Sequence, residues 1–479
     1  MSFRALRAAF ADALGVDGVV YDPQALARYA EDLSEEAPRK PLLAVRPKNT
    51  TQVQAALRVA REHEVALTPR VAGSSASGLT LSLEGGVVLD LSRMHRILEV
   101  SAEDRFALVE PGVTWAALRA RLGEQTPRLR VGYPLAPPDS SVVAGCLLDG
   151  MTNLSLRYGS MGTWIAGLEV VLPNGHLVRT GAAAGGGGFF GHSPLPDLTG
   201  LFVGWQGTSG VVTKLGLELW PEPAVRRHLF VLVYERAGAF AMMRELARLE
   251  CCDDVGAVTW PAGKLLLEQT RPLERDPEEP EVFLYLELSG QSERELSLRV
   301  ALVHDALERL RNHGVEHEAP VPLADLLRLN PRFACFAETP TRLSFLLDPP
   351  GGGLSWIGAY GPLSRFDGLA DHAAALMADR GFAPLMLGRP MKGGHYGALR
   401  FISTFRRQHP EEVARVRHLS RELLHAVLDH GCLPERIPPW AFPELRGRLD
   451  AGYLELFARL RQLLDPTGTL SPHCLSTAP

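Results

Sequence analysis

The amino-acid sequence predicts an α+β fold divided into two domains, and three observations lead to this expectation. Residues 42–70 read as strand, helix and strand, and the segments that follow read as strand pairs joined by turns. After Pro223 the composition changes to long apolar strands alternating with amphipathic helices. At 479 residues, the chain is also too long for one simple core.

The first strand–helix–strand unit begins with the apolar run Leu42–Val45. Thr51 is the expected helix N-cap, with Gln54 completing a capping box, and Val65–Thr68 begins the second strand. The apolar residues of the helix fall on one face: Val53, Leu57 and Ala60. A unit of this length favours parallel strands joined by a right-handed crossover.

The remainder of the first domain is predicted to be mostly antiparallel. The stretch "GGVVLDLS" reads as a strand, and the next two strands form a hairpin that turns at Ala102–Asp104. Thr114 is placed to cap a helix through "WAALRARL", and Asn174–Gly175 is a typical hairpin turn.

The second domain is predicted to be an antiparallel sheet covered by helices. Its strands are expected in "HLFVLVY" and "EVFLYLEL", with a helix in "AFAMMRELARLE" between them. Further elements are expected as follows: a helix at Ser292–Asn312, strands at Leu354–Tyr360, Pro384–Leu387 and Leu399–Thr404, and a helix at Glu411–His430.

Composition excludes several classes of function. The apolar fraction of 46% and the charged fraction of 22% are those of an ordinary folded protein, and a net charge of −5 gives no attraction to nucleic acid or anionic membranes. The six cysteines form no C-x-x-C pair, so we expect buried free thiols and no metal site. No segment resembles a signal peptide or a membrane span, so a soluble, cytoplasmic protein is expected.

The loop "VAGSSASG", residues 71–78, follows the second strand and consists almost entirely of small residues. Such a loop can turn several backbone N–H groups toward an anion, and its serines can add hydroxyl donors. The alternative interpretation is a tight connecting loop that binds no ligand, which would have the same composition. The sequence contains no G-x-x-x-x-G-K-[ST], and no G-x-G-x-x-G opens a helix after the first strand. Both absences disfavour a P-loop or Rossmann protein.

Seven segments in order resemble the FAD-binding domain of the vanillyl-alcohol oxidase/p-cresol methylhydroxylase family. They are "RPKNTTQVQAALRVA", "PRVAGSSASG", "VVLDLSRMHRILEV", "VEPGVTWAALRARL", "YPLAPPDSSVVAG", "RYGSMGTWIAGLEVVLPNGHLVRTG" and "GTSGVVTKLGLELWP". The tail "LRQLLDPTGTLSP" is similar to the ending of that family. Each motif alone is weak, and seven in the right order are specific.

The resemblance implies a fold and a division of the chain. We expect a p-cresol methylhydroxylase (PCMH)-type, two-subdomain FAD-binding domain at residues 1–223 and a substrate (cap) domain at residues 224–430. Residues 431–479 are expected to return to the FAD-binding domain.

The resemblance also implies which residues contact FAD. These residues form three groups. The first is the loop that wraps the pyrophosphate, the second is a segment that lines the cofactor, and the third contacts the flavin or adenine. The implied residues are Arg70, Val71, Ala72, Gly73, Ser74, Ser75, Ser77 and Gly78; Pro138, Asp139, Ser140, Ser141, Ala144 and Gly145; and Tyr158, Gly159, Gly207, Gly210 and Val212. Val71 and Ala72 stand where family members carry more glycine.

Five residues beyond the first domain are candidates for chemistry. His395, in "MKGGHYGALRF", could act as the base for a substrate hydroxyl because the pKa of histidine lies near neutrality. Tyr396 is adjacent, and Arg400 or Arg436 could hold an anionic group, as could Lys392. A structural histidine and a solvated strand edge are the alternatives.

Two departures from the family bear on substrate and cofactor attachment. Phenol oxidases of the family hold a phenolate with tyrosines and an arginine; Arg436 matches the arginine, but Glu435 and Ser74 stand at the tyrosines. A phenolate beside Glu435 would meet a like charge. Ala359 stands where some members attach FAD to a histidine, although Tyr360 is adjacent, so non-covalent FAD is expected.

The resemblance therefore implies an FAD-linked oxidase or dehydrogenase that passes a hydride from an alcohol or 2-hydroxy acid to flavin N5. A phenolic or aromatic alcohol and a non-catalytic FAD-binding subunit of an electron-transfer complex are the alternatives. The electron acceptor stays open between oxygen, a quinone and a redox protein, and a homodimer is one expected assembly.

Overall fold

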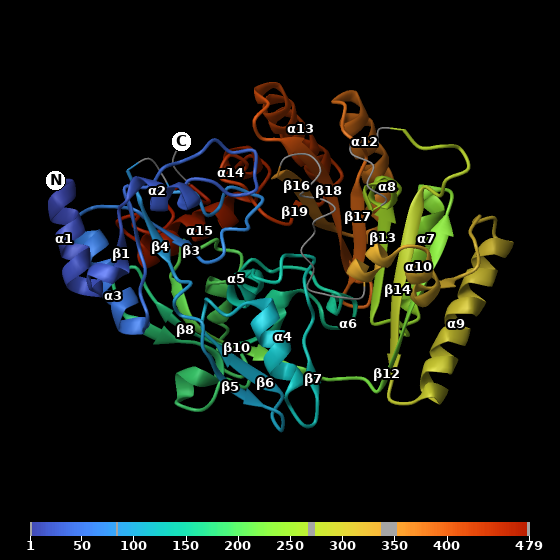
Figure 1. Cartoon of the computed structure of the whole chain (residues 1–479), viewed down its shortest axis with the longest axis horizontal. Helices are drawn as coiled ribbons and strands as arrows, with labels where there is room; N and C mark the ends of the chain where they lie inside the picture. Colours follow the sequence, from blue (N-terminus) through green and yellow to red (C-terminus); the bar gives the residue numbers. More distant parts are fainter. Residues whose placement is uncertain (1, 83–84, 267–273, 337–351, 477–479) are drawn as a thin grey trace.

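The computed structural model describes residues 2–82, 85–266, 274–336 and 352–476. In Figure 1 the elements before residue 223 form one half of the molecule, and a sheet with long strands forms the other. Helices α14 and α15 near the C-terminus lie back beside the N-terminal half. Among the helices of the described ranges, none combines the length and the apolar character that crossing a membrane requires.

The N-terminal sheet has the order β1-β2-β4-β3. Strands β2 and β3 both run parallel to β4, which lies between them, so the predicted parallel unit is confirmed. Helices α1 and α3 bury their apolar faces against it, including Val53, Leu57 and Ala60. The elements are α1 (Phe3–Leu14), β1 (Val19–Val20), α2 (Pro23–Leu26), β2 (Leu43–Val45), α3 (Thr50–Glu62), β3 (Leu67–Arg70) and β4 (Val87–Asp90).

The predicted cap of α3 is wrong by two residues. Asn49, not Thr51, is the N-cap: its side chain accepts a hydrogen bond from the Gln52 N–H at 3.0 Å. Gln52 then reaches back to accept one from the Lys48 N–H at 2.8 Å. The physical reason is that asparagine caps a helix at least as well as threonine, and Asn49 is reached first along the chain.

The second sheet is antiparallel, with the order β5-β6-β10-β8-β9. It contains both predicted hairpins, β5–β6 around residues 102–105 and β8–β9 around Asn174–Gly175, where Gly175 has a φ of 86°. Thr114 caps α4 as predicted. The elements are β5 (Ile97–Ser101), β6 (Phe106–Val109), α4 (Trp115–Gly123), α5 (Val142–Leu147), α6 (Ser155–Tyr158), β8 (Ile165–Val171), β9 (Leu177–Arg179) and β10 (Val211–Glu218).

The third sheet confirms the predicted antiparallel architecture and has eight strands among the described residues, in the order β15-β12-β14-β13-β17-β18-β16-β19. Its strands are β12 (Val225–Val233), β13 (Asp254–Thr259), β14 (Val282–Gly290), β15 (Val321–Pro322), β16 (Gly352–Gly361), β17 (Met386–Met391), β18 (Tyr396–Arg406) and β19 (Leu433–Pro434). Four helices pack on one face around a large apolar core: α7 (Arg236–Arg248), α9 (Glu293–Asn312), α12 (Phe366–Asp379) and α13 (Pro410–Asp429). Among the described residues, the short helices α8 (Pro261–Leu266) and α10 (Leu323–Leu329) also belong to this half, whereas α14 (Phe442–Arg446) packs against α15.

The C-terminal segment contacts both halves. Strand β19 adds to the edge of the large sheet beside β16. After α15 (Ala451–Leu464), Leu470 pairs with Leu67 of β3, the strand that precedes the small-residue loop. The three-part division of the chain into domains stays a prediction.

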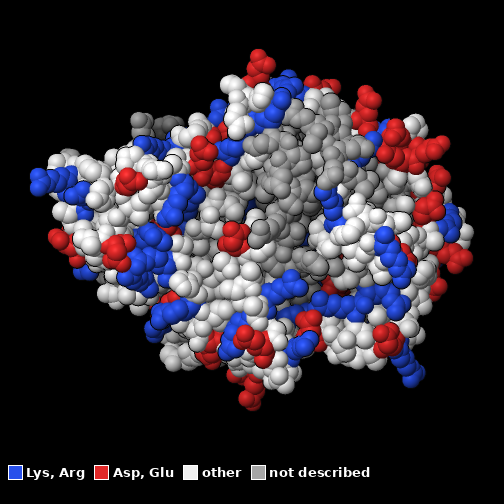
Figure 2. All heavy atoms as spheres, viewed as in Figure 1, with Lys and Arg blue, Asp and Glu red and all other residues white. Residues whose placement is uncertain are grey.

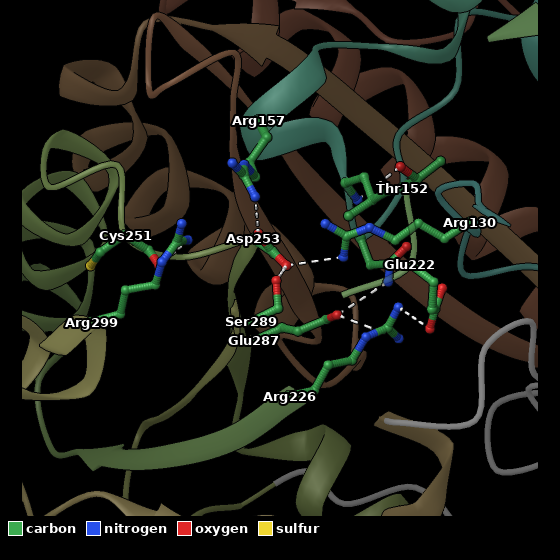
Figure 3. A network of polar contacts seen from close by, with 12 residues as sticks. Arg130, Thr152, Arg157, Glu222, Arg226, Cys251, Asp253, Glu287, Ser289 and Arg299 are labelled. Carbon is green, nitrogen blue, oxygen red and sulfur yellow. Dashed lines mark hydrogen bonds and ion pairs between the residues drawn. The ribbon is translucent and has the colours of Figure 1, made fainter. Parts of the chain in front are cut away.

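A buried ion cluster joins the two halves (Figure 3). The Asp253 side chain, at the start of β13, has no exposed surface and accepts hydrogen bonds from Arg157 at 2.6 Å and from Arg130 at 3.0 Å. Arg130 belongs to β7 (Leu129–Arg130), which pairs with β11 (Trp220–Pro221). Burial alone would raise the pKa of Asp253, but the two arginines hold it below its ordinary value.

We expect Asp253→Asn to destabilise the protein strongly, because it leaves two guanidinium groups facing an uncharged partner in a buried site. Removing one member of a buried ion pair costs about 3–5 kcal/mol. Thermal unfolding should show a midpoint well below that of the wild type, whereas the exposed Asp12→Asn serves as a control that should unfold like the wild type. An unchanged midpoint for Asp253→Asn would contradict this account of the junction.

Candidate functional site

A cleft lies between the two halves. Its walls come from three places: the small-residue loop after β3, the segment from Pro134 to Gly145, and the face of the large sheet opposite its helices. The large sheet contributes Leu354, Trp356 and Arg400, and Arg436 follows β19. Sequence segments more than 300 residues apart therefore meet in one cavity.

The small-residue loop presents unused backbone donors to this cleft. Residues 71–76 line the wall, and among the described residues the N–H groups of residues 72–76 donate no hydrogen bond to the protein. Gly73 has a φ of 73°, which turns the chain so that successive N–H groups face one side. A row of free N–H groups in such a turn binds anionic oxygens, and phosphate is the common case.

Arg70 holds this loop from behind. Its guanidinium donates to the backbone oxygens of Arg28 at 2.7 Å and Tyr29 at 3.3 Å, and it is buried. A Cβ atom on Gly73 would lie 2.1 Å from Arg70 Nη2, so only glycine fits against the clamp. Arg70 was predicted to contact the cofactor, but the structure keeps it outside the cleft wall, where it fixes the shape of the loop.

In the second predicted cofactor segment, too, only some of the residues line the cleft. Ser140, Ser141, Ala144 and Gly145 line the cleft, whereas Pro138 and Asp139 are not on its wall. Ser141 is the N-cap of α5; its Oγ accepts from the Ala144 N–H at 3.1 Å and donates to the Pro111 oxygen at 2.6 Å. The serine hydroxyl is therefore occupied within the protein.

The remaining predicted cofactor residues are not on the described wall of the cleft. Tyr158 stacks on Trp220, with 4.3 Å between ring centroids. Gly207 packs near Pro69 and Ser471. The residues away from the wall are Ser77, Gly78, Tyr158, Gly159, Gly207, Gly210 and Val212.

A fully buried ion pair forms the floor of the cleft on the large sheet. Arg400 donates to Glu435 from Nε at 2.8 Å and also from Nη2, and the exposed fractions of the two side chains are 4% and 0%. Burial alone would raise the pKa of Glu435 and lower that of Arg400, but their attraction reverses both directions. The negative charge of Glu435 is thereby compensated locally.

Arg436 is the guanidinium of this site without a hydrogen-bond partner among the described residues. None of its nitrogens forms a hydrogen bond with the described protein, and its Nε is buried. Trp356 interacts with both arginines: its ring centroid lies 5.0 Å from Arg400 Cζ and 5.3 Å from Arg436 Cζ. Burial lowers the pKa of Arg436, and the carboxylate of Glu435 opposes this effect. A charged donor group thus lines the cavity with hydrogen-bonding capacity that the described protein does not use.

The structure places His395 away from the other candidates. It lies in the turn between β17 and β18, is exposed, and is not on the cleft wall; neither is Lys392 in the same turn. This turn packs on α6 through bonds from the N–H groups of Lys392 and Gly393 to the oxygens of Ser155 and Leu156. The structure therefore brings together Arg400 and Arg436, and it does not bring His395 to them.

Tyr396 and Tyr360 lie beside the cleft and contact one another, with 5.9 Å between ring centroids. Burial, reinforced by Glu435 and Asp149, raises the pKa of Tyr360 well above its ordinary value, and its hydroxyl donates to the Asp149 oxygen at 2.8 Å. Ala359, which was aligned with a flavin-attaching histidine, faces the opposite side of the sheet, in the core beneath the helices. Strand alternation therefore separates Ala359 from the cleft.

Sequence reasoning missed two residues of the site. Trp356 carries no motif, and only the alternation of β16 could have placed it on the cleft face with Leu354. Asp149 lies between two wall residues, Leu148 and Gly150, with an unusual φ of 50°. Its carboxylate accepts from the Gly162 N–H at 2.9 Å, and burial raises its pKa. The sequence signal for this residue was the pair Asp149–Gly150, because Asp-Gly pairs are typical of turns.

The chemistry of the wall follows from its composition. Among the described residues that line it, there is no histidine, cysteine, tyrosine, aspartate or glutamate. The wall thus offers backbone donors, small residues, an apolar and aromatic surface, and two arginines. In the described ranges, no three His, Cys, Asp or Glu side chains gather as a metal site would require.

Comparisons with known proteins agree with this geometry. A family model described as "FAD binding domain" matches residues 41–181, which include the small-residue loop and the second cleft segment. The chain is 30% identical over 342 residues to glycolate oxidase subunit GlcD of Bacillus subtilis, covering 63% of this chain and 69% of that protein. It is 26% identical over 447 residues to the mitochondrial D-lactate dehydrogenase [cytochrome] of Arabidopsis thaliana, covering 90% and 73%.

The fold has a solved counterpart. The structure of p-cresol methylhydroxylase with bound substrate superposes with a TM-score of 0.87 at 21% identity, covering 99% of this chain and 96% of that one. The FAD-binding match, the free donors of the loop and this fold agree with one another. The chain belongs to the PCMH-type family of FAD-linked oxidoreductases and binds FAD.

Proposed function

We propose that this oxidoreductase binds an organic anion against Arg436 and oxidises it by hydride transfer, and that a para-substituted phenol, held as phenolate, is the substrate class. The observation that carries the proposal is the guanidinium of Arg436, which lines the cleft without a partner in the described protein. A fixed guanidinium in a shielded cavity selects a negatively charged group.

FAD fits the other side of the cleft. The free N–H groups of residues 72–76 suit its pyrophosphate, and the small residues Ala144 and Gly145 let a flat ring system approach closely. The chemistry that FAD supplies when bound is acceptance of a hydride. The protein's task is then to orient the substrate and to set its charge.

The described residues of the wall include no base, which favours a phenolate. A phenol next to Arg436 loses its proton more readily, because the opposite charge stabilises the anion and lowers its pKa. Electron density from the ionised oxygen then weakens a benzylic C–H bond at the para position, and no base is required at that carbon. The apolar side chains of Leu354 and Met151 and the ring of Trp356 provide contacts for an aromatic substrate.

The sequence argument against a phenolate loses its basis in this geometry. It assumed that Glu435 would present an uncompensated negative charge. In the structure Glu435 accepts two hydrogen bonds from Arg400 and has no exposed side-chain surface. Together with Arg436, the site therefore carries a net positive charge.

A 2-hydroxy acid is the second candidate, favoured by the glycolate and D-lactate enzymes among the sequence relatives. Its carboxylate would pair with Arg436 in the same way. Its hydroxyl proton needs an acceptor, and the described wall supplies none. Asp149, which lies between the wall residues Leu148 and Gly150, is a group of suitable chemistry, with a pKa raised by burial.

We further propose that FAD is held without a covalent bond. Covalent attachment needs a nucleophile at the wall, and the described wall has no histidine, cysteine or tyrosine. Tyr360, the closest phenol in sequence to the expected attachment point, already donates its hydroxyl hydrogen bond to the Asp149 oxygen.

Acid precipitation of the purified yellow protein should therefore release free FAD into the supernatant. The absorbance of the supernatant near the flavin band and mass spectrometry of the denatured chain measure the two fractions. A chain whose mass includes one FAD would refute non-covalent binding.

Gly73→Val should weaken FAD binding by roughly tenfold to a hundredfold, because the new side chain strains a left-handed backbone and collides with Arg70. Fluorescence titration of the apoprotein with FAD measures the affinity. Gly185→Val is a matched control, since a Cβ at Gly185 meets no atom within 4 Å. Equal FAD affinities in all three proteins would place the phosphate site elsewhere.

Arg436→Met should slow flavin reduction by 4-methylphenol by roughly tenfold to a hundredfold at low substrate concentration, because a hydrogen bond to a charged group is lost. Stopped-flow absorbance follows the bleaching of bound FAD under anaerobic conditions. Arg294→Met, on the exposed side of α9, is the control for loss of one positive charge. Reduction of the wild type by D-lactate and not by any phenol would replace the proposal with the second candidate.

A further inference from the structure

Two neighbouring cysteines lie just before β13, beside the ion cluster that joins the two halves. Cys251 and Cys252 follow α7 and directly precede Asp253, whose buried carboxylate accepts hydrogen bonds from two arginines. The two sulfur atoms are 3.9 Å apart, which is a hydrogen-bond distance for sulfur. We propose that this pair is a site of reversible oxidation by a peroxide, which converts the two thiols to a disulfide between adjacent residues.

The peptide group between the two cysteines has few hydrogen bonds to lose. Both residues lie outside regular secondary structure, between the end of α7 and the start of β13. Among the described residues, the Cys252 N–H donates no hydrogen bond, and the Cys251 oxygen accepts one, from Arg299 at 3.4 Å. A ring through two adjacent residues requires this peptide group to rotate, and here the rotation breaks that one bond.

The two thiols differ in how readily they ionise. The hydrogen bond between them lowers the pKa of Cys251, against the effect of burial, and raises that of Cys252. Arg299 adds a positive charge near Cys251, although Glu295 pairs with this arginine at 2.7 Å. The two aspartates that follow Cys252 raise its pKa further. Cys251 is therefore the thiol that forms a thiolate, which is the form that reacts with peroxides.

The pair lies beneath charged side chains at the surface. Cys251 and Cys252 are 4% and 1% exposed, whereas the side chains of Arg299 and Arg157 are 22% and 32% exposed. Figure 3 shows Cys251 beside Arg299, on the side of Asp253 away from Arg130. Figure 2 shows Lys and Arg side chains gathered in a band at the lower centre of the face in view, the region where α6 lies in Figure 1. The oxidant that passes such a layer must be small, and hydrogen peroxide meets this condition.

The reaction balances with one hydrogen peroxide per pair. The Cys251 thiolate attacks one peroxide oxygen: an S–O bond forms, the O–O bond breaks, and the hydroxide that leaves takes up the thiol proton to give water. The Cys252 sulfur then attacks the sulfur of this sulfenic acid: the S–S bond forms, the S–O bond breaks, and the hydroxide leaves with the Cys252 proton as a second water. Two thiols are thus oxidised to one disulfide, and one peroxide is reduced to two molecules of water.

The disulfide acts on the junction through Asp253. A ring across adjacent residues encloses too little chain to restrict the unfolded state, so it gives little of the usual stabilisation by a disulfide. Rotation of the peptide group breaks the bond from Arg299 and shifts the residue that precedes Asp253 relative to Arg130 and Arg157. Oxidation should therefore lower the midpoint of thermal unfolding.

Peptide mass analysis of the full-length, FAD-loaded protein tests the modification. The protein is treated with hydrogen peroxide, the remaining thiols are alkylated under denaturing conditions, and trypsin releases residues 249–264, which contain both cysteines and no other. We expect this peptide to lose the mass of two hydrogen atoms, to carry no alkyl group, and to regain both thiols after reduction with dithiothreitol. Cys335→Ser, which removes the least buried of the six cysteines, should give the same result.

Cys251→Ser provides the matched variant that cannot form the ring. Its Cys252 should remain open to alkylation after the same treatment, and peroxide should lower the unfolding midpoint of the wild type but not that of this variant. Two alkylated thiols in the treated wild type, or gain of oxygen without loss of hydrogen, would overturn the proposal. An unfolding midpoint that stays unchanged after complete disulfide formation would overturn the effect on the junction. Since no readout involves turnover, the result is independent of the substrate class.

Discussion

The ion pair between Arg400 and Glu435 decides which positive charge the wall of the cleft presents. Two arginines and one glutamate meet on the face of the large sheet, and the geometry decides which positive charge remains. Arg400 donates two hydrogen bonds to Glu435. Arg436 therefore keeps its hydrogen-bond donors available for an external acceptor. An isolated buried charge is unfavourable, and this arrangement therefore favours occupation of the cleft by an anion.

The same pair shows why the order of residues along the chain was insufficient to derive the charge of the cleft wall. In the sequence, Glu435 and Arg436 are neighbours, and a direct pairing between them is the simple assumption. Arg400 comes from β18 and meets Glu435 only because β18 and the segment after β19 both flank β16. Long-range pairing of this kind depends on strand order in the sheet, which no local pattern of the sequence encodes.

Elements with strong local signals were predictable from sequence. The parallel unit around β4, the hairpin at Gly175 and the helix beginning after Ser292 all have a turn or cap residue that specifies them. The cofactor loop was predictable because an ordered set of motifs surrounds it. The orientation of Ala359 was not, since a shift of one residue in a strand exchanges its two faces. The place of His395 was not predictable for a similar reason: its separation from the described cleft wall depends on the length of the β17–β18 hairpin, and its role as a base stays a prediction.

The two sides of the cleft are also tied together by a segment without a motif. The Leu33 N–H donates to the oxygen of Ser75 in the cofactor loop, and the Leu33 oxygen accepts from Leu354 of the large sheet. Two more bonds extend this tie: Arg407 donates to the Asp32 oxygen, and Arg417 donates to the Glu35 oxygen at 2.7 Å. Residues 32–35 take part in these contacts through their backbone atoms. The types of these residues are therefore weakly constrained and give little sequence signal. Residues 32–35 thus couple the position of the small-residue loop to that of the large-sheet wall, and the proposed hydride transfer requires that both be fixed together.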